Sequence, residues 1–360
     1  MGCCNAYPGE EGKAKRLDCF DGLARKEKAN DEKERTQKAD GRVGDVPVAT
    51  ESNSGVVSLK EHLLETHSAP ARSLLAEWNL HKKGDPGFST QPYRSTYLLF
   101  ANRTNRRNQQ PSSQASGHTV TQPFDWDQEE IKFQFSLKSE LTYKDGLNLA
   151  DFDKLRLWFG YTQQSNWQAY NFSKSSPFRE NNYEPELILT LGRRQPEMRR
   201  GQDTSDVQER DTSSFKLVNI GFSHQSNGRS NPESRSWWRM YVQGGWEFRN
   251  AFSLLGRVWW RFREKSANDD NPDIRSYVGR GDIMAKWEPV ENHIASLLYR
   301  NSLSLGSNRG FAQVDWSFPR LADGVMRPYL QYTSGYGESL IDYNFRQWTL
   351  GAGVSFELGK

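Results

Sequence analysis

The sequence predicts an all-β protein, a twelve-stranded antiparallel transmembrane β-barrel that follows a charged N-terminal extension. Three observations predict this fold. After about residue 90 apolar and polar residues alternate, aromatic residues often lie near the ends of the apolar face, and the opposite face is charged. Lipid excludes free sheet edges, and a closed barrel with an even number of strands leaves none.

The N-terminal extension, residues 1–75, is rich in Lys, Glu, Asp and Gly. Its stretch "RKEKANDEKERTQKADGR" is typical of a solvated, mobile segment. We expect the extension to be periplasmic and partly disordered. From Ser58, a capping box with Glu61 and leucines at helical spacing predict one or two short helices, broken near Pro70.

The three cysteines, Cys3, Cys4 and Cys19, all lie in this extension. They have no His or Cys partners at zinc spacing, so they make a poor metal site. Free thiols and a bridge from Cys3 or Cys4 to Cys19 are both open. The start of the chain has no apolar signal-peptide core, so we expect that an exported protein has its signal removed or outside this sequence.

The barrel domain, residues 76–360, contains the alternating segments. In "IKFQFSLKSEL", Ile131 and Phe133 share one face, and Lys132 and Gln134 the other. Segments of roughly 10 residues suit a tilted strand that crosses a bilayer. About twelve such segments begin near residues 93, 130, 154, 183, 215, 236, 251, 275, 292, 310, 325 and 343.

Alternation alone also fits a soluble β-sandwich. The aromatic pairs Tyr277 with Trp287, and Trp348 with Phe356, favour the barrel because aromatic girdles mark the two membrane interfaces. On the opposite face, arginines and acids can pair inside a closed lumen. The net charge of only +3 gives no reason to expect nucleic acid as a partner.

A histidine and a serine end the fifth segment, "FKLVNIGFSHQS". His224 and Ser226 have the parity of the apolar residues Ile220 and Phe222, which places them on the lipid-facing side. Their backbones are about 7 Å apart by strand geometry, and a serine needs a neighbouring base to become a nucleophile. If the extension is periplasmic, the pair lies at the outer leaflet, where a lipid ester presents its carbonyl group. A girdle histidine and a hairpin serine without chemistry are the alternative interpretation.

Long motifs decide between these interpretations. The segment "HQSNGRSNPESRSW" closely resembles the active-site segment of the outer-membrane phospholipase A family, the calcium-dependent barrel phospholipases of Gram-negative bacteria. The resemblance covers roughly residues 75–356. Further matching segments are "YTQQS" at 161–165, "SSPFRENNYEPEL" at 175–187, "DDNPDIRSYVG" at 269–279 and "SGYGESLIDYNF" at 334–345.

The resemblance implies a hydrolytic site on the outer wall of the barrel. Ser226 matches the family's nucleophile, His224 its general base, and Gly228 the residue whose N–H group forms the oxyanion hole. The implied reaction is calcium-dependent hydrolysis of phospholipid acyl esters at both the sn-1 and sn-2 positions, and of lysophospholipids. The implied location is the bacterial outer membrane, with the site facing the outer leaflet.

The resemblance also implies a Ca²⁺ site that two subunits share. Its ligands would be the main-chain carbonyl of Arg229, the hydroxyl of Ser234, and Ser175 from the partner subunit. Gln163 matches a polar residue buried at the interface of the active homodimer. Ca²⁺ takes neutral oxygen ligands readily and can polarise an ester carbonyl. Loop capping is the alternative role of the two serines.

One residue departs from the family pattern. Trp238 occupies the position of the asparagine that orients the catalytic histidine, and an indole has one donor and no acceptor. We therefore expect weakened hydrolysis rather than none. The competing interpretation is a catalytically impaired or dead barrel with a structural or binding role. A diffusion porin is a third, disfavoured because open pores usually need about 16 to 18 strands.

Overall fold

The computed structural model describes residues 73–80, 90–194, 214–248, 252–290, 292–304, 308–321 and 324–356. All of them belong to one compact unit, Ser68–Lys360. The expectations for the first 72 residues lie outside the described residues. They comprise the extension's mobility, the three cysteines and the helix start at Ser58.

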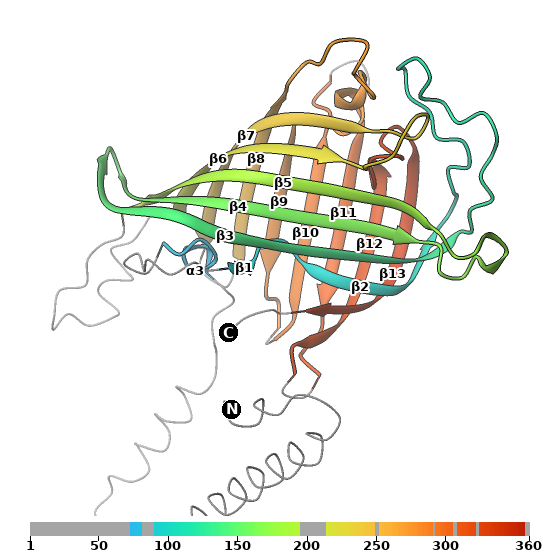
Figure 1. Ribbon diagram of the computed structural model, residues 1–360. Helices are drawn as coiled ribbons and strands as arrows, with labels where there is room; N and C mark the ends of the chain where they lie inside the picture. The colour runs from blue at the N-terminus through green and yellow to red at the C-terminus, as the bar shows by residue number, and fades with distance from the viewer. Residues whose placement is uncertain are drawn as a thin grey trace, which may run out of the picture. The chain divides into compact units, whose positions relative to one another are not determined.

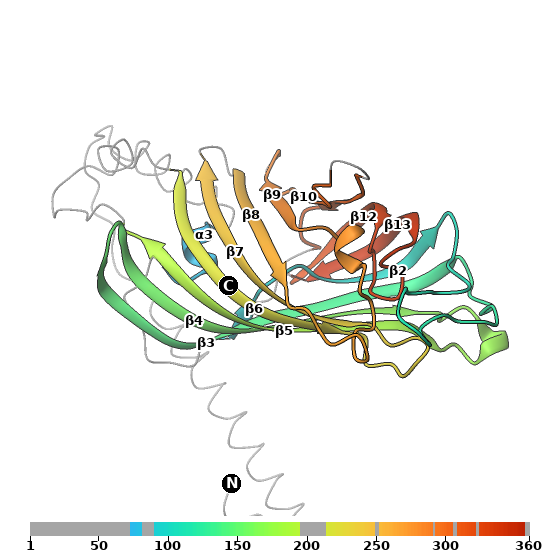
Figure 2. The same cartoon turned by 90° about the horizontal axis from the view of Figure 1, so that it is seen from above.

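The described residues form one antiparallel sheet of thirteen strands, of which all but β1 make the barrel. Strand β2 pairs with β13 along Thr96–Thr104 and closes the sheet on itself. Figure 1 shows the strands side by side, and Figure 2 shows the sheet curving round. The predicted twelve-stranded barrel is confirmed. The barrel strands are β2 (Thr96–Thr104), β3 (Glu129–Leu149), β4 (Phe152–Trp167), β5 (Phe178–Arg193), β6 (Phe215–Ser226), β7 (Ser236–Phe248), β8 (Phe252–Arg261), β9 (Gly281–Trp287), β10 (Ile294–Asn301), β11 (Gly310–Ser317), β12 (Met326–Tyr336) and β13 (Arg346–Phe356).

Two strands start away from their predicted positions. Strand β5 begins at Phe178 rather than near residue 183, and β9 begins at Gly281 rather than near residue 275. The short 3-10 helix η2 (Ile274–Ser276) precedes β9, and Tyr277 is its C-cap. Tyr277 packs against Tyr336 and Tyr343, so its placement in a strand-end aromatic girdle was wrong.

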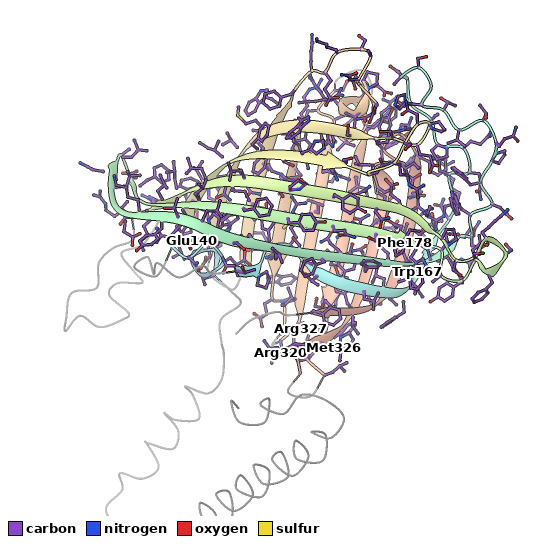
Figure 3. All side chains as sticks on the ribbon, in the orientation of Figure 1. Glu140, Trp167, Phe178, Arg320, Met326 and Arg327 are labelled. Carbon is purple, nitrogen blue, oxygen red and sulfur yellow. The ribbon has the colours of Figure 1, made fainter. Side chains whose placement is uncertain are left out.

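The alternation separates an apolar outer wall from a charged interior. Phe135 is 42% exposed, whereas Lys132 and Glu130 on the same strand are buried. Figure 3 shows Trp167 and Phe178 close together near one end of the wall, where their rings stack at 5.7 Å. Exposed apolar side chains are the expected surface of a strand that faces lipid.

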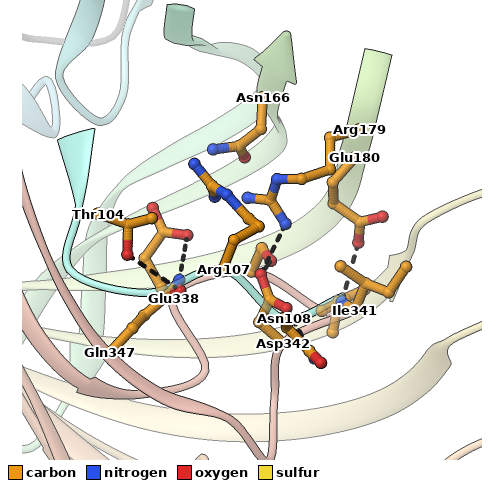
Figure 4. A network of polar contacts seen from close by, with 12 residues as sticks. Thr104, Arg107, Asn108, Asn166, Arg179, Glu180, Glu338, Ile341, Asp342 and Gln347 are labelled. Carbon is orange, nitrogen blue, oxygen red and sulfur yellow. Dashed lines mark hydrogen bonds and ion pairs between the residues drawn. The ribbon is translucent and has the colours of Figure 1, made fainter. Parts of the chain in front are cut away.

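Ion pairs fill much of the lumen, as the sequence predicted. Arg179 donates to Glu130 at 2.9 Å and to Asp342 at 2.7 Å, and Arg107 also pairs with Glu130. Figure 4 shows Arg179 directed at Asp342 with Arg107 beside it. Lys132 pairs with Glu338 at 2.6 Å. Because these buried ion pairs lie inside the barrel, an open diffusion pore is disfavoured.

A short segment precedes the barrel. Helix α3 (Leu74–Glu77) is capped by the hydroxyl of Ser73, and strand β1 (Thr90–Pro92) pairs with β3 beyond the end of β2. Trp78 is buried, with its ring 6.0 Å from Trp158 and the ammonium of Lys138 3.2 Å from its centroid. Among the described residues, no helix is long and apolar enough to cross a membrane.

The interior ion pairs predict a large stability difference between two arginine variants. Arg179→Met would leave the buried Asp342 with only the neutral donors Asn108 and Ser339. We expect the free energy of unfolding to fall by about 3 to 5 kcal/mol. Arg103→Met is the matched control, because its pair with Glu129 is exposed and should contribute at most about 1 kcal/mol. Urea titration of the refolded protein in detergent micelles measures both, and equal losses would contradict the account.

Candidate active site on the outer wall

The β6–β7 hairpin positions the site. Its register pairs His224 with Trp238 and Ser226 with Ser236. Ser223 is fully buried and Phe222 is 42% exposed, so His224 and Ser226 belong to the outward-facing set. The structure therefore confirms the parity predicted for the histidine and the serine.

His224 is held by aromatic contacts. Its ring centroid lies 4.1 Å from that of Trp238, with the planes 31° apart, and Trp238 in turn stacks on Phe222 at 5.1 Å. The Nδ1 atom of His224 is buried and has no hydrogen-bond partner. No hydrogen bond forms between His224 and Ser226, so the two neighbours have not adopted the geometry of proton transfer.

Gly228 directs a donor at the serine. Its main-chain N–H donates to Oγ of Ser226 at 3.1 Å. Gly228 has a φ of +63°, and a Cβ atom there would lie 3.2 Å from the ring of Tyr183. Glycine suits this position because a side chain would strain the backbone and crowd the tyrosine. The N–H group therefore points at the hydroxyl oxygen of Ser226.

Asn227 holds the loop that follows. Its Oδ1 accepts from the main-chain N–H groups of Arg229 and Arg235, and its Nδ2 donates to the carbonyl of Glu233 at 2.8 Å. The guanidinium of Arg229 pairs with Glu233 at 2.6 Å and donates to the carbonyls of β5. These contacts fix the Arg229 main chain beside the serine. The role of Asn227 was missed by the sequence analysis.

Asp270 joins the site from a distant loop. One of its oxygens accepts hydrogen bonds from the hydroxyls of Ser234 at 2.7 Å and Ser236 at 3.2 Å. Its other oxygen contacts Nε2 of His118 at 3.1 Å. In the sequence, the only signal for Asp270 is its place in the matched segment at 269–279, far from the hairpin.

A tyrosine anchors the loop that carries Asp270. The hydroxyl of Tyr343 donates to Asp273 at 2.6 Å. Burial, together with this hydrogen bond, raises the pKa of Tyr343 well above its usual value. The hydroxyl therefore stays a donor, and the contact ties this loop to the segment between β12 and β13.

Ser175 forms no hydrogen bond with Arg229 or Ser234, the other expected calcium ligands. It ends the 3-10 helix η1 (Phe172–Lys174) with φ +59° and ψ +33°, and its side chain is exposed. Gln163 lies on β4, in the pairing row that runs through Tyr183 to Ser226. Its amide contacts only neutral groups, Tyr161 and Ser165. Within one chain, neither residue forms a hydrogen bond with the hairpin loop.

The donor chemistry at the loop fits a hard cation. The Ser234 hydroxyl donates a hydrogen bond to Asp270, so the lone pairs of its oxygen can face a cation, and the carboxylate adds negative charge. The described residues contain no group of three or more His, Cys, Asp or Glu that could hold a metal. A calcium ion would thus depend on hydroxyl and carbonyl oxygens, and on further ligands from outside this chain.

Comparisons with known proteins identify the family of this chain. A profile of the phospholipase A1 family matches residues 75–356. A putative phospholipase A1 of Neisseria meningitidis is 35% identical over 263 residues, 72% of this chain and 63% of that protein. Phospholipase A1 of Escherichia coli K12 is 33% identical, over 81% of this chain and 89% of that enzyme.

Solved structures give the same result. Outer membrane phospholipase A from Escherichia coli matches with a TM-score of 0.60 and 31% identity, over 80% of this chain and 98% of that one. The Salmonella typhi outer membrane phospholipase, solved as a dimer with bound calcium, matches with a TM-score of 0.61 and 32% identity, over the same shares. The chain therefore belongs to the phospholipase A1 family, a family of outer-membrane β-barrel enzymes.

Proposed function

We propose that this protein hydrolyses the acyl esters of phospholipids, with Ser226 as the nucleophile and His224 as the general base. The observation that carries the proposal is the outward position of both residues, with the Gly228 N–H directed at Oγ of Ser226. On this wall the accessible substrate is a membrane lipid. Family membership supports the same reaction.

In the proposed reaction, Oγ of Ser226 attacks the ester carbonyl and its proton passes to His224. The carbonyl oxygen becomes an oxyanion that accepts the hydrogen bond of Gly228, which must leave Oγ to form it. His224 then gives the proton to the departing lysophospholipid alcohol. Water hydrolyses the acyl-enzyme with His224 again as the base. His224 and Ser226 must approach each other when lipid binds.

Calcium and a second subunit would complete the site. In the proposal, the Arg229 carbonyl and the Ser234 hydroxyl hold Ca²⁺ with Ser175 of the partner subunit, and Gln163 lies at the dimer interface. The calcium-bound dimer of the Salmonella typhi enzyme supports this arrangement. When bound, the ion supplies positive charge that polarises the ester carbonyl.

The finer assignments are part of the same proposal. They are phospholipase A1, A2 and lysophospholipase activities, a site facing the outer leaflet, and a barrel domain of residues 76–360 behind an N-terminal extension. A catalytically impaired barrel is the second candidate, and the observation that favours it is Trp238 against the His224 ring. In the Escherichia coli enzyme, an asparagine-to-alanine change is described as an active-site mutation.

The nucleophile assignment predicts a calcium-dependent activity that one substitution removes. With Ca²⁺, the refolded protein should release fatty acid from mixed phospholipid–detergent micelles, and with EDTA it should release much less. The Ser226→Ala variant should release none above background. A folded barrel that releases no more fatty acid than Ser226→Ala would favour the impaired barrel instead.

The calcium assignment predicts different effects of two neighbouring serines. Ser234→Ala should raise the Ca²⁺ concentration needed for half-maximal activity by roughly 10-fold or more, the scale seen for changes at metal sites. Ser236→Ala is the matched control, because it loses the same kind of hydrogen bond to Asp270 without losing a proposed ligand. Chemical crosslinking over the same titration reports dimer formation. Equal shifts in the two variants would remove Ser234 from the ligand set.

Because Trp238 stands where the family has an asparagine, restoring the asparagine should raise activity. Trp238→Asn should raise fatty-acid release by roughly 10- to 1000-fold, the range covered when one member of a catalytic unit is restored. An amide oxygen can accept the proton on the far nitrogen of the histidine, which an indole cannot do. If Trp238→Asn is no faster than the natural protein at saturating calcium, the explanation by a missing orienting residue is wrong.

A further inference from the structure

The Trp238 indole is the group in closest ring contact with His224. The 4.1 Å centroid separation and the 31° tilt place the imidazole over the indole face. Trp238 is itself held on the wall by Phe222, and Phe222 by Phe262 at 5.6 Å. The register explains the contact, because His224 and Trp238 are directly opposed on adjacent strands.

No ionised side chain acts on the His224 ring from the described part of the chain. The influences on it are partial burial and the main chain of Trp237. The outward-facing side chains around it are aromatic, hydroxylic or apolar. They are Tyr183 and Pro185 on β5, Phe222 and Ser226 on β6, Ser236 and Trp238 on β7, and Phe262 after β8. The nearby Asp270 carboxylate is hydrogen-bonded to Ser236.

This environment matters at one step of the proposed reaction. When Ser226 gives up its proton, His224 becomes an imidazolium in a half-buried, lipid-facing place without a carboxylate beside it. A bare cation there is costly. An aromatic face is attractive to a cation because of the negative potential above the ring, and tryptophan is the strongest of the aromatic residues.

We propose that Trp238 is the positioning residue of His224, which it orients by stacking and whose cationic form it stabilises through the face of its indole ring. The proposal rests on the proposed function. In place of a hydrogen bond at Nδ1, the ring is fixed by contact over its surface. Phe222 backs the indole, so the imidazole has a firm support rather than a mobile side chain.

The test replaces Trp238 in the full-length protein with mono-, di- and trifluorotryptophan, introduced at this site alone. Fluorine withdraws charge from the ring face and changes its shape little. We expect kcat/KM to fall stepwise along the series, with kcat carrying the loss. Trp238→Leu should lose about 3- to 30-fold, the range of cation–π energies, and Trp238→Phe should recover part of that loss. The acid limb of the pH profile should move to lower pH in Trp238→Leu, because the imidazolium has lost its support.

Trp260→Leu is the matched control, since Trp260 is 56% exposed on the same wall and opposes Met240 rather than the histidine. A flat fluorination series with an unmoved acid limb would show that Trp238 only packs, and would overturn the proposal. Should the natural protein have no activity that depends on Ser226, the proposed function fails separately. Then NMR titration of the His224 ring decides: the midpoint moves to lower pH in Trp238→Leu if the proposal holds, and stays unchanged if it does not.

Discussion

The pairing of β2 with β13 is the constraint on which the rest of the structure depends. Along this seam Gly353 lies so close to the facing strand that a Cβ atom would be 2.0 Å from the carbonyl oxygen of Leu98. The register also shifts between Ala352 and Gly353. In lipid each unpaired backbone group is costly, so the sheet has to close on itself. Closure gives every strand one face toward the lumen and one toward the membrane.

That division of faces determines what the site can reach. The lumen holds paired charges such as Arg179 with Glu130 and Asp342, whereas the histidine and serine lie on the other side of the same wall. A hydrolytic site inside the barrel would meet small soluble molecules. On the outer wall the neighbouring molecules are lipids, so the parity of the two β6 residues supports the proposed substrate class. The loop that Asn227 holds then supplies what the strand cannot, a main-chain N–H directed at Ser226.

The sequence was most informative where a period of two applies. Ten of the twelve barrel strands start within about four residues of their predicted positions, because alternation directly reflects the two faces of a strand. The exceptions have local causes. The segment before β9 contains Pro272 and folds into η2. The start of β5 was predicted too late because its first residues include Arg179 and Glu180, which are polar as in a loop but are buried.

Site geometry was less predictable. Strand parity and hairpin register predicted that His224 and Trp238 lie opposite each other. The ring contact between them and the absence of a His224–Ser226 hydrogen bond depend on side-chain rotamers, which the sequence pattern does not predict. Asp270 was not identified as a partner of Ser234, because the two residues lie 36 positions apart in the sequence, with β7 and β8 between them. Ser175 has no hydrogen bond to Arg229 or Ser234 within one chain, and its assignment as a ligand requires a second copy.

The most direct measurement of the central claim is covalent labelling of the folded barrel with a long-chain fluorophosphonate, followed by peptide mass mapping. Such a probe reacts with a serine only when a base activates it and when the chain can approach from the lipid side. The account predicts one adduct, on Ser226, which is lost in His224→Ala and promoted by Ca²⁺. A folded protein that carries no adduct, or an adduct on another serine, would contradict the assignment of the outer-wall hairpin as the active site.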